Sequence, residues 1–146
     1  WYTENCTASI PAALANNAFY GSAKNGKISS VLRAELAEAA VNVALSEGHE
    51  NQTYELAGST SWTLADLAAE ISKQTGKGIP YVDIPAADYA AALVQAGLNE
   101  GFAGLIAQWD VDASNGALFS EDKTLDKLLG RPTAGLDVAV KQAIDH

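Results

Sequence analysis

The sequence predicts a helix-rich α/β domain, with a few short strands and about six helices. The first observation is that apolar residues recur every three or four positions in several segments, most clearly over residues 33–47. The second is that segments 53–56 and 81–84 alternate in polarity and end at Gly or Pro, as short strands do. The third is that 48% of the 146 residues are hydrophobic, many of them Ala, which suffices for one domain with a packed core.

The N-terminal part is expected to contain one short helix between irregular segments. Residues 1–10 mix polar and apolar side chains without a period, which indicates a loop. A proline suited to a first helical turn then opens a helix over residues 11–17, and Ser9 can cap it. Asn25-Gly26 indicates a turn, and residues 27–31 follow as a short extended segment.

The middle of the sequence carries the clearest helical periods. Residues 33–47 have apolar side chains around much of the helix circumference, so we expect this helix to be largely buried and to end at Gly48. Thr63 and Asp66 resemble a capping box, with Asp in place of the usual Glu, at the start of a helix over residues 63–76.

The C-terminal part is predicted to be helical after the strand at 81–84. Helices are expected over residues 85–97, 99–111 and 122–129, and a last helix follows Thr133, which can cap it. The predicted apolar face of the second of these helices consists of Leu105, Ile106 and Trp109.

The composition argues against several classes of partner. The formal net charge is −9 and the basic residues are scattered singly, so nucleic acid is not an expected ligand. No apolar run approaches the roughly 20 residues of a membrane-spanning helix, so no membrane is expected as a partner either. The single cysteine, Cys6, cannot form an internal disulfide and is interpreted as an inert thiol.

Motifs for phosphate, metal and triad chemistry are missing from the sequence. The glycines are dispersed, so no GxGxxG turn or P-loop can hold a dinucleotide phosphate. His49 and His146 have no partners at ligand spacing, which argues against a metal site and against a Ser-His-Asp triad.

Two further patterns have catalytic interpretations that the local sequence disfavours. The carboxylate pairs Glu35/Glu38 and Asp110/Asp112 are interpreted as solvated helix faces rather than as acid–base pairs. Residues 20–24 match a Tyr-x-x-x-Lys pattern, but the glycines beside the Tyr and after the Lys predict turns, which would separate the two side chains.

Several segments, taken in order, resemble one known family. They are WYTEN at 1–5 with PAAL at 11–14, NGKI at 25–28 with LRAELA at 32–37, YELAG at 54–58 with WTLADLA at 62–68, and KTLDKLLGRPT at 123–133. In this order the sequence resembles the C-terminal half of the bacterial NAD(P)H:quinone oxidoreductase type 2 group, which is NmrA-like and related to the atypical short-chain dehydrogenases/reductases. The resemblance runs the whole length of the chain.

The resemblance implies one part of a flavin-free, cytoplasmic reductase. Residues 1–146 would be the C-terminal, substrate-side lobe of an NAD(P)-binding Rossmann-type reductase, and an absent N-terminal Rossmann half would be their partner. NADPH or NADH, bound largely by that absent half, would pass a hydride directly to a quinone, with no metal and no flavin. The chain alone is expected to be inactive, and a homodimer is one candidate for the oligomeric state.

The resemblance also assigns residues to the cofactor and to the substrate. The cofactor-binding residues that it implies are Trp1, Tyr2, Thr3, Glu4 and Arg33, and the residues expected to face a quinone are Tyr2 and Asn5. Glu35 is not assigned, because the family pattern often has Asp at that position, and no catalytic residue is assigned. One bound dinucleotide can reach the whole set only if residues 1–4 and Arg33 lie on the same side of the molecule.

Two other functions stay open on the sequence alone. One is an NmrA-like regulator that binds NAD(P) as a sensor and has no enzyme activity. The other is a helical interaction module without a nucleotide-binding half.

Overall fold

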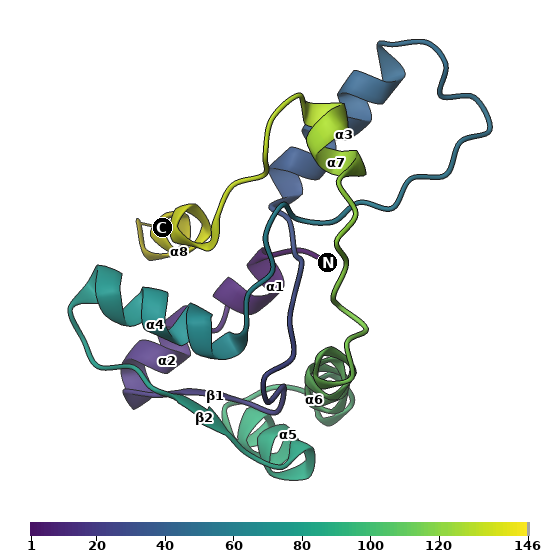
Figure 1. Ribbon diagram of the computed structural model, residues 1–146. Coiled ribbons are helices and arrows are strands. Elements are labelled where there is room, and N and C mark those ends of the chain that lie inside the picture. Colours follow the sequence, from purple (N-terminus) through teal and green to yellow (C-terminus); the bar gives the residue numbers. More distant parts are fainter. Residues whose placement is uncertain (146) are drawn as a thin grey trace.

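Helices dominate the computed structural model, which describes residues 1–145 (Figure 1). In chain order the elements are α1 (Glu4–Thr7), α2 (Ile10–Asn16), β1 (Phe19–Gly21), α3 (Arg33–Ala44), α4 (Leu64–Thr75), β2 (Tyr81–Asp83), α5 (Ala86–Gln95), α6 (Glu100–Ser114), α7 (Thr124–Leu129) and α8 (Leu136–Asp145). The helix-rich α/β class predicted from the sequence is confirmed. The short helix α1 lies inside the segment that was expected to be a loop.

The sheet consists of two short parallel strands that lie far apart in the sequence. β1 pairs with β2, so that Phe19 lies opposite Tyr81 and Gly21 opposite Asp83. The strand expected over residues 81–84 is therefore confirmed, but the strand expected over 53–56 is wrong. There Leu56 packs against a small hydrophobic cluster that includes Leu125, so the alternation of this segment reflects packing on one face rather than sheet pairing.

The extended segment over residues 27–31 holds the N-terminus in place. Its backbone makes two isolated bridges, one between Ile28 and Trp62 and one between Val31 and Tyr2. The backbone N–H of Thr3 also donates to the carbonyl of Val31 at 3.0 Å. These bonds set the first residues of the chain directly beside the start of α3.

The main core is built around the amphipathic helix α4. Its side chains Leu67 and Ile71 are fully buried, together with Ile10 of α2 and Val140 of α8. Burial of each such side chain stabilises the fold by about 2–3 kcal/mol. The other helices extend from this core.

Helix α4 begins at the capping box that the sequence predicts. The backbone N–H of Asp66 donates to the Thr63 hydroxyl at 3.2 Å, and the backbone N–H of Thr63 donates to the Asp66 carboxylate at 2.8 Å. Gly76 ends this helix with φ +69°, in the left-handed region where a glycine is favoured. The shorter Asp side chain therefore performs the reciprocal role of the usual Glu.

Helix α3 corrects the expectation of a largely buried helix over 33–47. It ends at Ala44, and in the part of the chain that the structure describes its only buried residues are Glu35 and Ala39. Val41 is 54% exposed and Leu45, just beyond the helix, is 83% exposed. In Figure 1, α3 packs beside α7 in a lobe that projects from the rest of the molecule, so most of its circumference meets solvent.

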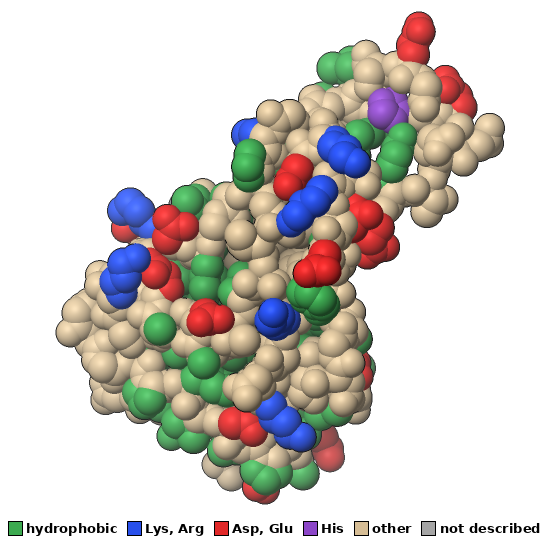
Figure 2. Space-filling view, viewed as in Figure 1, with side chains coloured by type: hydrophobic (Ala, Val, Ile, Leu, Met, Phe, Trp, Pro, Cys, Tyr) green, Lys and Arg blue, Asp and Glu red, His purple; other side chains and the backbone are tan. Residues whose placement is uncertain are grey.

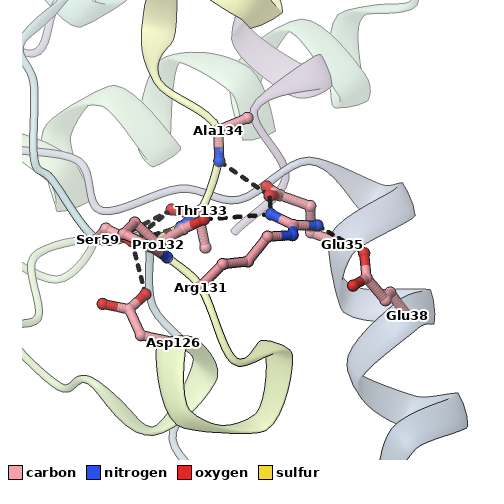
Figure 3. Close-up of polar contacts among 8 residues, drawn as sticks. All are labelled: Glu35, Glu38, Ser59, Asp126, Arg131, Pro132, Thr133 and Ala134. Atoms are coloured by element: carbon pink, nitrogen blue, oxygen red, sulfur yellow. Dashed lines mark hydrogen bonds and ion pairs between the residues drawn. The ribbon is translucent and has the colours of Figure 1, made fainter.

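A polar network holds this projecting lobe to the chain segment that precedes α8 (Figure 3). Arg131 donates to Glu35 at 2.7 Å and to Glu38 at 2.6 Å. The other contact of the Glu35 carboxylate is with the backbone N–H of Ala134, at 2.9 Å. Glu35 is only 5% exposed, so the interpretation of Glu35/Glu38 as a solvated pair is wrong for its first member.

Two predicted caps differ from the structure. Ser9 occupies the N-cap position of α2, but its side chain makes no capping hydrogen bond. The hydroxyl of Thr133 accepts a hydrogen bond from the backbone N–H of Ser59 at 2.8 Å, and it does not cap α8. The hydroxyl is engaged by a loop 74 residues away in sequence, which a local pattern cannot reveal.

The surface of the described residues gives two further findings. No helix within residues 1–145 combines the length and the apolarity that a membrane span requires. On the face drawn in Figure 2, basic and acidic side chains are interspersed rather than gathered into one basic patch.

Candidate functional site

A cavity of about 600 Å³ opens between the N-terminal helices and the pair α5–α6. This volume lies in the range of pockets that enclose small organic ligands. The apolar part of its lining includes Phe19, Ile28, Leu64, Leu93, Phe102 and Trp109. Elements from both ends of the chain therefore build one apolar cavity.

Three aromatic side chains form a continuous wall of this cavity. The rings of Trp1 and Trp109 meet edge to face, with centroids 5.1 Å apart and an interplanar angle of 74°. Phe102 meets Trp109 in the same way at 6.1 Å and 84°. Edge-to-face pairs fix ring orientations, so this wall offers a preformed apolar surface to a flat aromatic ligand.

Three of the five residues that the resemblance assigns to the cofactor lie at the edge of this cavity. Trp1, Glu4 and Arg33 are among its lining residues. The guanidinium of Arg33 lies over the ring of Tyr2, 4.8 Å from its centroid. Residues 1–4 and Arg33 thus lie on one side of the molecule, as a single bound dinucleotide requires.

Hydrogen bonds explain why these residues converge. The Glu4 carboxylate accepts from the backbone N–H of Arg33 at 3.0 Å, so it satisfies a free N–H at the start of α3. The guanidinium of Arg33 donates to the side-chain oxygen of Asn5 at 3.3 Å. Within residues 1–145 the Arg33 guanidinium forms no ion pair with a carboxylate, which leaves its charge available to an anionic ligand.

Thr3 and Tyr2 are placed differently from the rest of the predicted set. The hydroxyl of Thr3 is buried against the Ser30 hydroxyl at 2.8 Å, away from the cavity lining. Tyr2 is 43% exposed and contacts the site through Arg33 rather than by lining the cavity. Asn5, the other residue expected to face a quinone, does line the cavity.

Asp110 is a lining residue that the sequence analysis missed. Its Oδ2 atom accepts a hydrogen bond from the backbone N–H of Ser22 at 2.7 Å, just beyond the end of β1. Burial raises the pKa of this carboxyl from its ordinary value of 3.8 to about 6. The hydrogen bond from Ser22 lowers the pKa and the negative charge of Asp83 raises it, but both effects are smaller than that of burial. The interpretation of Asp110 as part of a solvated face is therefore wrong.

The helical period of α6 contained a signal for this residue. Ala103 and Ala107 are buried, and Asp110 follows them at the next position on the same stripe. The predicted apolar face included Leu105, yet Leu105 is 53% exposed. The small alanines mark the side where another element approaches closely, and the carboxylate falls on that side.

Besides Asp110, and Glu4 and Arg33 at its edge, the cavity is lined by two ionisable side chains whose pKa values are raised, Cys6 and Tyr89. Burial raises the pKa of the Cys6 thiol to about 12, which agrees with the interpretation of an inert thiol. Burial also raises the pKa of Tyr89, with a smaller contribution from the charge of Asp110. Near neutral pH both side chains therefore stay protonated, and Asp110 is the group whose charge can change.

The remaining motifs lie outside this cavity. Tyr20 belongs to β1 and Lys24 follows in a turn with φ +51°, so the two side chains do not share a helix face. His49 contacts the hydroxyls of Ser46 and Tyr54, whereas His146 lies outside the described residues. Among residues 1–145 no cluster of His, Cys, Asp and Glu has the arrangement of a metal site.

Comparison with known proteins places this architecture in a family. Quinone oxidoreductase 2 of Escherichia coli K12 is 51% identical over 140 residues, which cover 96% of this chain and 49% of that protein. The crystal structure of the E. coli enzyme complexed with NADPH matches with a TM-score of 0.94 and covers 99% of this chain and 51% of that one. The chain belongs to the quinone oxidoreductase type 2 family. No protein-family model matches the sequence.

Other relatives of this quinone oxidoreductase type 2 chain have different names. The structure of Citrobacter sp. triphenylmethane reductase matches with a TM-score of 0.94 and 32% identity, over 100% of this chain and 51% of that one. An NAD(P)H azoreductase of Xenophilus azovorans is 27% identical over 132 residues, 90% of this chain and 46% of that protein. The chain thus spans about half the length of these relatives, and it matches the C-terminal part of the quinone oxidoreductase.

The raised pKa of Asp110 predicts a stability effect in this family member. Because the folded state holds the proton more tightly than the unfolded chain, the charged carboxylate destabilises the fold above about pH 6. We expect Asp110→Asn to increase the free energy of unfolding at pH 7 by about 1–2 kcal/mol, after allowance for partial exposure. Urea denaturation should show this gain shrink as the pH falls and vanish below about pH 4. A gain that persists at low pH would contradict the assignment.

Proposed function

We propose that this chain is the substrate-side half of an NAD(P)H-dependent quinone reductase, completed by an N-terminal Rossmann half. The observation that carries the proposal is the apolar, aromatic-walled cavity whose edge gathers Trp1, Glu4, Asn5 and Arg33. The similarity to E. coli quinone oxidoreductase 2 over nearly the whole chain supports it. We place such a reductase in the cytoplasm, and a homodimer is one candidate for its assembly.

The residues at the cavity edge fit one end of a nicotinamide nucleotide but not the whole of it. Arg33 offers a cation to an anionic group of the nucleotide, and the aromatic wall offers an apolar surface to a ring. The sequence contains no glycine-rich phosphate turn, so most nucleotide contacts must come from the Rossmann half. When bound, NADPH or NADH supplies a hydride.

The chain's own contribution is to position the acceptor and to exclude water. A flat quinone can lie in the apolar cavity against Trp109 and Phe102, close to the edge where Arg33 lies. Direct hydride transfer depends chiefly on such proximity and alignment, and in this proposal it uses no metal and no flavin.

The proposal is tested by the oxidation of NADPH with a soluble benzoquinone. The full-length protein, with its Rossmann half, should consume NADPH in a quinone-dependent manner, while the 146-residue chain alone should not. NADPH binding without quinone-dependent oxidation would instead favour the NmrA-like sensor. Failure of the full-length protein to bind NADPH would contradict both the reductase and the sensor. The remaining interpretation would then be the helical interaction module.

The proposed role of Arg33 gives a specific expectation. We expect Arg33→Gln in the full-length protein to raise the KM for NADPH by about tenfold, since a charge-assisted hydrogen bond is worth about 1.5–3 kcal/mol. The KM for the quinone should stay within about twofold, because the substitution does not touch the aromatic wall. Lys77→Gln, which alters an exposed cation after α4, is the matched control and should leave both constants unchanged. An equal rise in both KM values would indicate a general disturbance of the site.

A further inference from the structure

We propose that Asp110 is the acid that protonates the acceptor while it is reduced. The inference rests on the proposed function and adds a named proton donor to it. Asp110 lines the cavity next to Trp109, whose ring forms the aromatic wall. Its Oδ2 atom is held by the backbone N–H of Ser22, whereas its Oδ1 atom makes no hydrogen bond with any of residues 1–145. One carboxyl oxygen is therefore anchored and the other is free to carry a proton to a ligand.

The backbone at the end of β1 sets the position of this carboxyl group. Gly21 has no side chain, and a Cβ atom at that position would come within 2.8 Å of Asp110 Oδ2 and 2.9 Å of a methyl group of Leu64. The glycine leaves the space in which the carboxylate approaches the strand end and accepts from Ser22. The site is thus shaped to hold this side chain over the parallel strand pair.

The reduction of a quinone needs a proton as well as a hydride. After a hydride has added to the quinone, one oxygen carries a negative charge and must gain a proton to give the neutral hydroquinone. In the proposed step the O–H bond of protonated Asp110 breaks, its proton forms the new O–H bond on the acceptor, and Asp110 is left as a carboxylate. Solvent then returns a proton to Asp110, so that atoms and charge balance over the cycle.

The other ionisable groups around Asp110 are poorer donors or are already engaged. Cys6 of α1 and Tyr89 of α5 keep their protons because burial raises the pKa of each. On β2, Tyr81 donates to Asp83 at 2.8 Å, and Asp83 also accepts from the backbone N–H of Lys24. The pKa of Asp110 is raised to about 6, so a useful fraction of this carboxyl is protonated near neutral pH.

The experiment compares two acceptors that differ in their need for a proton. A neutral benzoquinone needs a hydride and a proton, whereas a cationic triphenylmethane dye becomes neutral on gaining a hydride alone. In the full-length protein we expect Asp110→Asn to lower kcat for the quinone by about 100-fold, in the range of general acid catalysis. The kcat for the dye should stay within about twofold. Asp112→Asn, on the same helix but outside the cavity lining, should leave both unchanged.

Two further measurements separate proton donation from binding. The wild-type kcat for the quinone should fall as the pH rises above about 6, and Asp110→Asn should abolish that dependence. Quenching of tryptophan fluorescence by the quinone, measured without nucleotide, should give the same Kd for both proteins. If the wild type reduces the quinone but not the dye, the pH profile and this Kd decide whether Asp110 donates the proton.

The outcomes distinguish failure of this inference from failure of the proposed function. If the wild type reduces neither acceptor, the proposed function is wrong and this inference falls with it. If the wild type is active and Asp110→Asn retains its quinone kcat or its pH dependence, only the role of Asp110 is overturned. Equal losses with both acceptors, or a Kd raised in proportion, would show that Asp110 shapes the cavity without donating a proton.

Discussion

Arg131→Ala is expected to lower the free energy of unfolding by about 2–4 kcal/mol, because it leaves the buried carboxylate of Glu35 without a cation. The side chain of Glu35 is only 6% exposed, and one of its oxygens has no hydrogen-bond partner among the described residues even with Arg131 present. After the substitution only the backbone N–H of Ala134 would contact this carboxylate. Urea denaturation followed by far-ultraviolet circular dichroism measures the loss.

Glu38→Gln is the matched control for this network. Glu38 also receives a short hydrogen bond from Arg131, but its side chain is 43% exposed, so water can replace the contact. We therefore expect a loss below about 1 kcal/mol, as for other exposed ion pairs. Similar losses for Arg131→Ala and Glu38→Gln would show that the burial of Glu35 does not decide the energetics of the lobe.

The arrangement of the lobe also explains why α3 was expected to be buried. Its many alanines give an apolar pattern around the helix, yet each covers little surface and none requires a neighbour. The buried side of α3 is set by packing of Ala39 against Leu125 of α7 and by the contact of Glu35 with Arg131, which lies 96 residues further along the sequence. The apolar pattern within one helix cannot reveal partners that lie so far away in sequence.

Elements with strong local signals could be predicted from the sequence. The capping box at Thr63 and Asp66 and the glycine at position 76 lie within a few residues of the helix they delimit, so α4 was recognised almost to its ends. The strand β2 was predicted from its alternation, whereas its partner β1 was missed, because three residues are too few to show a period. Sheet pairing between such segments depends on the tertiary fold.

In the candidate site, too, some residues could be predicted from the sequence and others depend on the tertiary fold. The resemblance placed Trp1, Glu4, Asn5 and Arg33 together, because an ordered set of family segments implies their spatial arrangement. It could not show that the Thr3 hydroxyl turns toward Ser30, nor that Asp110 enters the cavity. Asp110 is held by the backbone of Ser22, 88 residues earlier in sequence, and only the assembled fold brings those two atoms within 2.7 Å.

Gly26→Ala is expected to destabilise the protein by about 2–3 kcal/mol through a backbone clash. A Cβ atom at position 26 would overlap the carbonyl group of Ala113 and come within 2.8 Å of the backbone nitrogen of Ser114. Neither group can turn aside as a side chain would, so the end of α6 or the loop must move. Ala113 also lines the cavity, and we therefore expect the quinone KM of the full-length protein to rise as well.

For Gly104→Ala, which lies in the helix that Gly26 contacts, we expect the opposite effect on stability. Apart from the adjoining residues and the backbone of α6 itself, no atom lies within 4 Å of a Cβ built at this exposed position, so alanine gains helix propensity without a clash. We expect the free energy of unfolding to increase by about 0.5–1 kcal/mol, with no change in quinone KM. Urea denaturation of Gly26→Ala and Gly104→Ala under identical conditions measures both changes in the free energy of unfolding. Opposite signs would show that the close approach of backbone at Gly26 sets the cost of that substitution. A loss at Gly104 as well would contradict this explanation, because no clash is expected there.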